Sequence, residues 1–192
     1  MILSRADQAE ATRRAALAAA RTLFARQGYD ATSLQAIADE MGVTKANVYY
    51  YFRTKAEILE ALLRPMADAL EALLDGAELT ATRAERVELL TSGFVDQVVT
   101  ARRSLGPLNL GDPALRRDLA ITRRLDQLSQ RGLRLLHGDH PTPDQAAGYW
   151  LAKDLGPVLR RLEELGDDEL RGTLTRLCRR LLADEAADPV HR

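Results

Sequence analysis

The chain has 192 residues, of which 46% are hydrophobic and 29% are charged, and its formal net charge is −1. This balance predicts a folded globular protein and excludes a disordered chain, because disordered chains lack the apolar residues that a core needs. The single cysteine, Cys178, excludes an internal disulfide framework.

The sequence also argues against two kinds of targeting segment. No apolar run approaches the roughly 20 residues that cross a bilayer. The first residues, MILSRADQAEATRR, lack the apolar stretch of a secretory signal. We therefore expect a cytoplasmic protein with no membrane partner.

Helical signals run through the whole chain, and no segment shows the sustained alternation that predicts a strand. Capping boxes, in which Thr or Ser is followed three residues later by Glu or Gln, predict helix starts at Thr32, Thr54, Thr82 and Thr142. We expect an all-α protein of about nine helices. They should cover about 7–27, 33–40, 44–51, 54–75, 82–103, two helices within 113–137, then 143–164 and 167–186.

These helices are predicted to form two domains, a three-helix N-terminal domain over 8–68 and a larger helical bundle over 69–192. Charge is divided unevenly between them, since residues 1–55 carry a net charge of +3 and residues 56–192 carry −4. A basic N-terminal part and an acidic remainder are typical of a DNA-contacting domain joined to one that does not contact DNA.

Residues 33–52 predict a helix-turn-helix motif. Ala38 is small enough for two helices to approach closely, and Gly42 suits a turn that needs a positive φ. Val43 and Val48 are the apolar residues that would hold the second helix against the first. The large aromatic residues that follow, Tyr51 and Phe52, are expected in the small core rather than at the DNA.

The second helix of this motif keeps a polar face, and its N-terminus suits a phosphate group because its N–H groups lack helical partners. Asn47 can pair with an adenine edge through two hydrogen bonds. Lys55, at the start of the next helix, is expected to face the same DNA backbone. The predicted contacts on the second helix are Thr44, Lys45, Ala46, Asn47, Tyr49 and Tyr50.

Five short segments carry a close resemblance to the N-terminal domain of tetracycline-repressor-like (TetR) family regulators, over about 13–63: FAxxGY (24–29), TSLxxIA (32–38), GVTK (42–45), VYxYF (48–52) and KxxIL (55–59). The resemblance implies an all-helical homodimer whose first three helices bind a DNA operator and whose C-terminal domain binds a small effector and dimerises. Asn47 and Tyr50 depart from the family pattern, which often has Thr or Ser and His there. The family positions that often touch DNA match Thr32, Thr44, Lys45, Tyr49 and Lys55.

By the same resemblance, the helices at 143–164 and 167–186 are expected to form the dimer interface, with the small residues 146–148 allowing close packing. The alternative is that both helices close the core of one subunit. The last helix shows a leucine stripe at Leu170, Leu174, Leu177 and Leu181. Candidate residues for an effector pocket, each also an ordinary core residue type, are Met66, Phe94, Tyr149 and Trp150.

The leading hypothesis is a homodimeric transcriptional repressor that a small-molecule effector releases from a pseudo-palindromic operator. An interaction adaptor that uses the same motif without effector control is the alternative. An enzyme is not expected, because the chain has no Gly-rich phosphate loop, nucleophile elbow or Glu-x-x-His pair. No cofactor or metal is expected either, since the spacing of His137, Asp139 and His140 fits no standard site.

Overall fold

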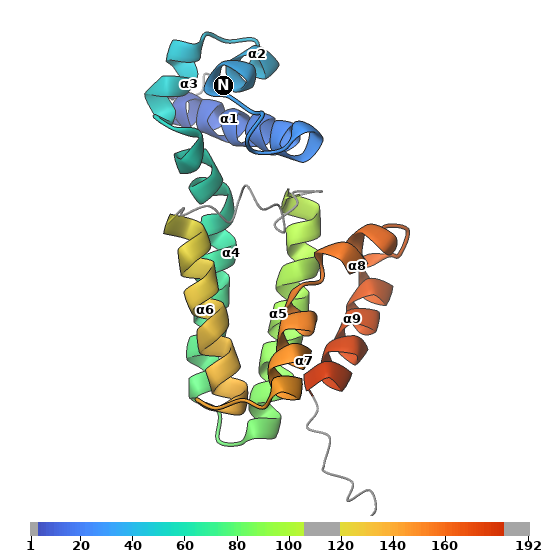
Figure 1. The fold of residues 1–192 in the computed structure, drawn as a ribbon. Coiled ribbons are helices and arrows are strands. Elements are labelled where there is room, and N and C mark those ends of the chain that lie inside the picture. The colour runs from blue at the N-terminus through green and yellow to red at the C-terminus, as the bar shows by residue number, and fades with distance from the viewer. Residues whose placement is uncertain (1–3, 106–119, 183–192) are drawn as a thin grey trace, which may run out of the picture. The chain divides into compact units, whose positions relative to one another are not determined.

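The computed structural model describes residues 4–105 and 120–182, and within these ranges it contains nine helices and no strand (Figure 1). The predicted all-α class is thus confirmed for the described part of the chain. The helices are α1 (Arg5–Gln27), α2 (Leu34–Met41), α3 (Lys45–Tyr51), α4 (Lys55–Glu78), α5 (Arg83–Leu105), α6 (Ala120–His137), α7 (Pro143–Lys153), α8 (Gly156–Arg161) and α9 (Asp167–Leu182).

Two predicted helix assignments differ from the structure. The described part of 113–137 holds one helix, α6, and a predicted helix start at Asp112-Pro113 lies outside the described residues. The segment 143–164 is divided into α7 and α8, since Pro157 occupies the first turn of a new helix after α7 ends at Lys153. In contrast, α4 continues through Pro65, although a proline inside a helix removes one of its main-chain hydrogen bonds.

Residue contacts divide the chain into two compact units whose boundary falls within α4, between Ala67 and Asp68. The first unit also includes the end of α5 and the start of α6. Each unit thus combines two separate segments of the chain, which a single cut in the sequence does not reproduce. The predicted domains over 8–68 and 69–192 stay a prediction. The units are Met1–Ala67 with Arg102–Leu125, and Asp68–Ala101 with Asp126–Arg192.

In the first unit, α1 packs on α2 and α3, and α2 packs on α3. The buried face of α1 is built largely from alanine, which lets the short helices approach closely before the larger Leu23 and Phe24 fill the space. The start of α4 completes this core. The other fully buried side chains of the unit include Ile37, Val48, Ile58, Leu59 and Leu63.

The N-terminus of α2 corrects one predicted capping box. Ser33, not Thr32, caps this helix, because the Ser33 hydroxyl accepts a hydrogen bond of 3.0 Å from the Ala36 N–H. The hydroxyl of Thr32 is turned inward and donates to the main-chain oxygen of Gly28 at 2.8 Å. The predicted boxes at Thr82 and Thr142 are both present, with reciprocal hydrogen bonds to the third residue of each helix.

In the second unit, α9 packs on α7. The buried residues of α9 recur at every fourth position, which corrects the predicted leucine stripe. Leu177 and Leu181 are only half-buried. Gly148 of α7 lies against the main-chain oxygen of Leu181, so its missing side chain allows α7 and α9 to pack closely. The buried residues of α9 are Leu170, Leu174, Cys178 and Leu182.

Arginines of α5 hold the ends of neighbouring helices in the second unit. Arg86 donates to the main-chain oxygens of Leu135 at 2.9 Å and of Ala77 at 3.2 Å, in the last turns of α6 and α4. Arg83 donates to the Leu136 oxygen at 3.2 Å. These cations satisfy carbonyl groups that have no partner within their own helix, and they fix three helices around the cavity described below.

Candidate nucleic-acid interface and effector cavity

The turn between α2 and α3 has the geometry that the sequence predicts. Gly42 adopts a left-handed conformation with φ +67°, and its N–H bonds to main-chain oxygens at the end of α2. The next N–H, of Val43, bonds to the Ala38 oxygen at 3.0 Å. Thr44 then caps α3 by accepting a hydrogen bond from the Asn47 N–H at 3.4 Å. Only three residues therefore separate α2 from α3, as in a helix-turn-helix.

One buried residue fixes which face of α3 is exposed. Val48 is completely buried, and Phe52 directly after the helix is 3% exposed. Tyr51 is half-buried, and its ring meets the Tyr50 ring edge-on with 5.0 Å between the centroids. The outward face carries all six predicted contact residues, each of them exposed: Thr44, Lys45, Ala46, Asn47, Tyr49 and Tyr50.

Arg53 adds a cation to this face that sequence reasoning missed. Its guanidinium group lies 4.7 Å from the centroid of the exposed Tyr49 ring, and the arginine itself is exposed. This stacking orients a positive charge beside the polar face of α3. Arg53 lies beyond the end of α3 at Tyr51, so no helical spacing in the sequence indicates this contact.

The other two predicted contacts have structural roles that occupy their side chains. Thr32 is 2% exposed, so its hydroxyl does not reach the surface. The ammonium group of Lys55 donates to the main-chain oxygens of Tyr29, Asp30 and Thr32 at 2.7, 3.0 and 3.1 Å. Because an ammonium group has three donors, none remains for a phosphate group in this conformation. Direct DNA contacts by these two side chains therefore stay a prediction.

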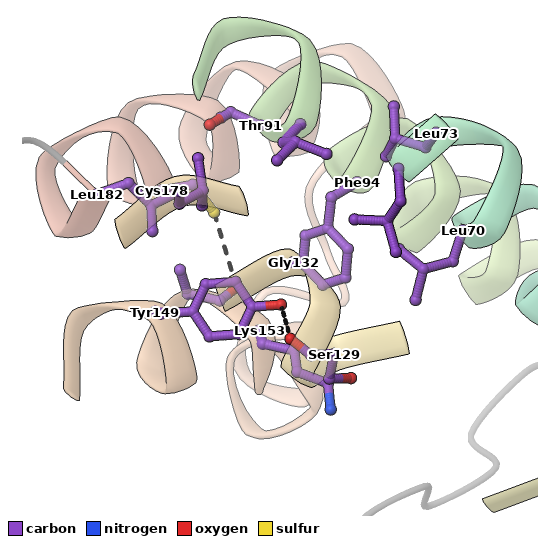
Figure 2. Close-up of a pocket in the computed structure, with 14 residues that line it drawn as sticks. Leu70, Leu73, Thr91, Phe94, Ser129, Gly132, Tyr149, Lys153, Cys178 and Leu182 are labelled. Carbon is purple, nitrogen blue, oxygen red and sulfur yellow. Dashed lines mark hydrogen bonds between the residues drawn. The ribbon is translucent and has the colours of Figure 1, made fainter. Parts of the chain in front are cut away.

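The second unit contains a cavity of about 60 Å³ among α4, α5, α6, α7 and α9 (Figure 2). Two of the four predicted pocket residues, Phe94 and Tyr149, line it, and Met66 and Trp150 do not. The Trp150 ring instead meets the Tyr149 ring edge-on and lies 5.0 Å from the Lys153 ammonium group. The surface of the lining is mostly apolar, and six of its residues are leucines: Leu70, Leu73, Leu74, Leu90, Leu136 and Leu182.

Two polar groups of the cavity wall are held by main-chain oxygens, as the dashed lines in Figure 2 show. The Tyr149 hydroxyl donates to the Ser129 oxygen at 2.7 Å, and burial raises the pKa of this phenol. The Cys178 thiol lies 3.8 Å from the Ala152 oxygen, and burial raises its pKa to about 11. Both groups are therefore neutral at physiological pH.

Thr91 is a polar residue of the wall that the sequence analysis does not identify. It is 2% exposed, and its hydroxyl has no hydrogen-bond partner. The sequence offers no distinguishing signal, because a threonine in an amphipathic helix is ordinarily a boundary residue. Within the described residues, no cluster of His, Cys, Asp or Glu is suited to a metal ion, and no helix has both the length and the apolar character to span a membrane.

Comparison with known proteins places these features in a family context. Residues 16–62 match the family described as bacterial regulatory proteins, tetR family. The transcriptional regulator TtgR of Pseudomonas putida is 32% identical over 78 residues, which are 41% of this chain and 37% of TtgR. The repressor KstR2 of Mycobacterium tuberculosis is 34% identical over 84 residues, which are 43% of this chain and 42% of KstR2. The matched segment thus spans about two fifths of these curated relatives.

Solved structures extend the likeness of fold over most of the chain. The structure of KstR2 covers 95% of both chains with a TM-score of 0.62 and 22% identity. A structure of AibR in complex with isovaleryl coenzyme A and operator DNA covers 85% of this chain and 96% of AibR, with a TM-score of 0.58 and 22% identity. The fold of most of the chain is therefore similar to that of KstR2 and AibR.

Proposed function

We propose that the chain, which belongs to the TetR family of bacterial regulatory proteins through its N-terminal domain, is a transcriptional repressor. It binds a pseudo-palindromic operator as a homodimer and leaves the operator when a small molecule occupies the second unit. The observation that carries the proposal is the outward face of α3. A buried valine anchors this helix, and its exposed side presents amide, hydroxyl and ammonium groups suited to base edges and phosphates.

In the proposed complex, Asn47 contacts a base edge, and Ala46 allows close approach to it. The hydroxyl of Thr44 and the ammonium group of Lys45 contact phosphates at the start of α3. Tyr49, with Arg53 stacked on it, and the exposed Tyr50 contact the backbone on the other side of the groove. Lys55 and Thr32 act indirectly, by holding the loop before α2 against the start of α4.

The DNA-binding proposal is tested by fluorescence anisotropy with the intergenic DNA upstream of the coding sequence, measured over a series of salt concentrations. Affinity should fall steeply as salt rises, because each phosphate contact releases counterions. Asn47→Ala should reduce the preference for this DNA over a scrambled fragment by about 1–3 kcal/mol. Equal binding to both fragments by the unmodified protein would favour the adaptor hypothesis instead.

The dimer is proposed to form through α7, α8 and α9. Leu151 on α7 supports this surface, because a leucine that is 63% exposed on the monomer gains from burial against a second copy. The half-buried Leu177 and Leu181 on α9 are further apolar residues available to it. Sedimentation equilibrium tests the proposal: the protein should be a dimer, and Leu151→Arg should be a monomer. A monomeric unmodified protein at high concentration would refute it.

Effector control is proposed because AibR, whose fold is similar, has been captured with both an acyl-coenzyme A molecule and operator DNA. Binding linkage requires that a ligand that lowers operator affinity is itself bound more weakly when the operator is present. A ligand of the cavity that leaves operator affinity unchanged would refute effector release but not DNA binding.

A further inference from the structure

We propose that the cavity of the second unit is a site for a small, uncharged and largely apolar molecule that carries one hydrogen-bonding group, which pairs with the hydroxyl of Thr91. This inference deepens the effector-binding role proposed above and rests on it. It is carried by the contrast between a mainly apolar wall and the buried hydroxyl of one wall residue, Thr91, which has no partner.

The conformation of Thr91 is unusual for a hydroxyl within a helix. Such side chains commonly donate to the main-chain oxygen four residues earlier. Thr12, Thr22 and the neighbouring Ser92 all do so, at 2.9, 3.1 and 2.8 Å. Thr91 does not, although it is 2% exposed. A buried polar group without a partner costs about 1–3 kcal/mol relative to one that is paired, and a ligand that supplies the partner recovers this loss on binding.

The wall selects against a charged ligand. Lys153 is the only ionisable residue of the wall that carries a charge at neutral pH, and its ammonium group is held over the Trp150 ring, 5.0 Å from the centroid. Figure 2 shows this side chain beside Ser129, below the Tyr149 ring. The phenol and the thiol are kept neutral by burial. A carboxylate entering among the leucines would lose its hydration, and the one cation of the wall, Lys153, is already held over the Trp150 ring.

Size and shape set two further limits on the ligand. A cavity of about 60 Å³ is several times larger than the ~10–15 Å³ that one water requires, but far smaller than a pocket for a drug-sized ligand. Figure 2 shows the rings of Phe94 and Tyr149 among the side chains that line it. A single small ring that packs on these aromatic side chains is therefore a suitable probe, with the leucine side chains adjusting around it.

Phenol, toluene and benzoate test the proposal, because they share one ring and differ only in a hydroxyl, methyl or carboxylate substituent. Isothermal titration calorimetry on the full-length protein at neutral pH should show phenol binding about three- to tenfold more tightly than toluene. Benzoate should not bind measurably. Benzoate binding as tight as that of phenol, equal affinities for phenol and toluene, or the absence of binding by either neutral ring would overturn the proposal.

Thr91→Val removes the hydroxyl while keeping the shape, and it should abolish the preference for phenol by raising toluene affinity and lowering phenol affinity. Ser92→Ala is the matched control, because it removes a hydroxyl from the same helix outside the cavity and should leave the ratio unchanged. A preference that persists in Thr91→Val would overturn the assignment. Thermal unfolding checks that Thr91→Val folds. The comparison of phenol, toluene and benzoate on the unmodified protein does not depend on this variant.

Operator affinity is measured separately by the anisotropy assay described above, without any probe present. If neither neutral ring binds but salt-dependent DNA binding is intact, only the proposed ligand class is rejected. If phenol binds but the protein does not bind DNA specifically, the regulatory function is rejected and the ligand site is retained.

Discussion

The ammonium group of Lys55 donates a hydrogen bond of 2.7 Å to the main-chain oxygen of Tyr29 and lies 4.4 Å from the centroid of the Tyr29 ring. Lys55 begins α4, whereas Tyr29 follows α1, so this contact joins two segments that are 26 residues apart. It also places the loop before α2, on which the position of the helix-turn-helix depends. Lys55 therefore belongs to the architecture of the DNA-binding unit.

Lys55→Met should lower the free energy of unfolding of the N-terminal unit by about 1–3 kcal/mol, because three carbonyl groups lose a charged donor. Operator affinity should fall, but the dependence of its logarithm on the logarithm of salt concentration should keep its slope, since no phosphate contact is removed. Urea unfolding monitored by circular dichroism measures the first effect, and a salt series in the anisotropy assay measures the second.

Lys45→Met is the matched control for that experiment. Lys45 is exposed on α3, so its loss should leave stability unchanged while reducing the magnitude of the salt slope by about one. The assignment of the two lysines would be reversed if Lys55→Met changed the slope and Lys45→Met changed the stability.

Gly42→Ala should destabilise the same unit by about 1–2 kcal/mol, because the φ of +67° forces an L-residue into the left-handed region. No atom lies within 4 Å of the added methyl group, so the cost is that of backbone conformation alone. Gly76→Ala is a useful contrast, since this glycine lies inside α4 and its methyl group would meet only Leu89 at an ordinary 3.8 Å. That change should stabilise the protein by about 0.5–1 kcal/mol. Equal effects in thermal unfolding would contradict this explanation.

The exposed face of α3 could be predicted from sequence because it depends on local periodicity. Once Val48 is placed in the core, the helical repeat directs Asn47, Tyr49 and Tyr50 outward. The role of Lys55 could not be predicted in this way. The resemblance to a DNA-binding family supplies a position and a charge, but the partners of that charge are main-chain oxygens in a loop far away in sequence.

The cavity illustrates a different limit of sequence reasoning. Its wall is drawn from five helices, so no single helical period reveals which apolar side chains meet there. Of the predicted pocket residues, Phe94 and Tyr149 line the cavity, whereas Trp150 packs against Tyr149. Thr91 has no distinguishing size or pattern. Its importance comes from the absence of a partner for its hydroxyl, which only coordinates reveal.

Gly148→Ala should destabilise the second unit by about 1–3 kcal/mol, because the added methyl group would clash with the main-chain oxygen of Leu181 on α9. A backbone atom cannot rotate away as a side chain can, so α7 and α9 must separate. Gly172→Ala is the control, since its methyl group would meet only the flexible end of the Arg176 side chain, at 3.3 Å. Thermal unfolding should separate the two variants, and equal midpoints would show that α7 and α9 tolerate a wider spacing.

The ion pair between Glu88 of α5 and Arg179 of α9 predicts a specific dependence of stability on pH. The guanidinium group binds both carboxylate oxygens, at 2.5 and 3.0 Å, and its hydrogen bonds hold the pKa of Glu88 below the usual value. A carboxyl group whose pKa is lower in the folded state stabilises the protein above its unfolded pKa, and this contribution is lost as the pH falls through the folded pKa.

Glu88→Gln should therefore lower the free energy of unfolding at pH 7, and its stability should converge with that of the unmodified protein as the pH falls through the lowered pKa of Glu88. The effect should be below about 1 kcal/mol, because both side chains are roughly half exposed and solvent screens the pair. Urea unfolding between pH 7 and pH 3 measures the difference, with Arg179→Gln and the double variant completing a cycle that isolates the pair. Since the glutamine cannot ionise, a difference that stays constant across this pH range would show that the charge of Glu88 contributes nothing. The side chain would then act only through packing.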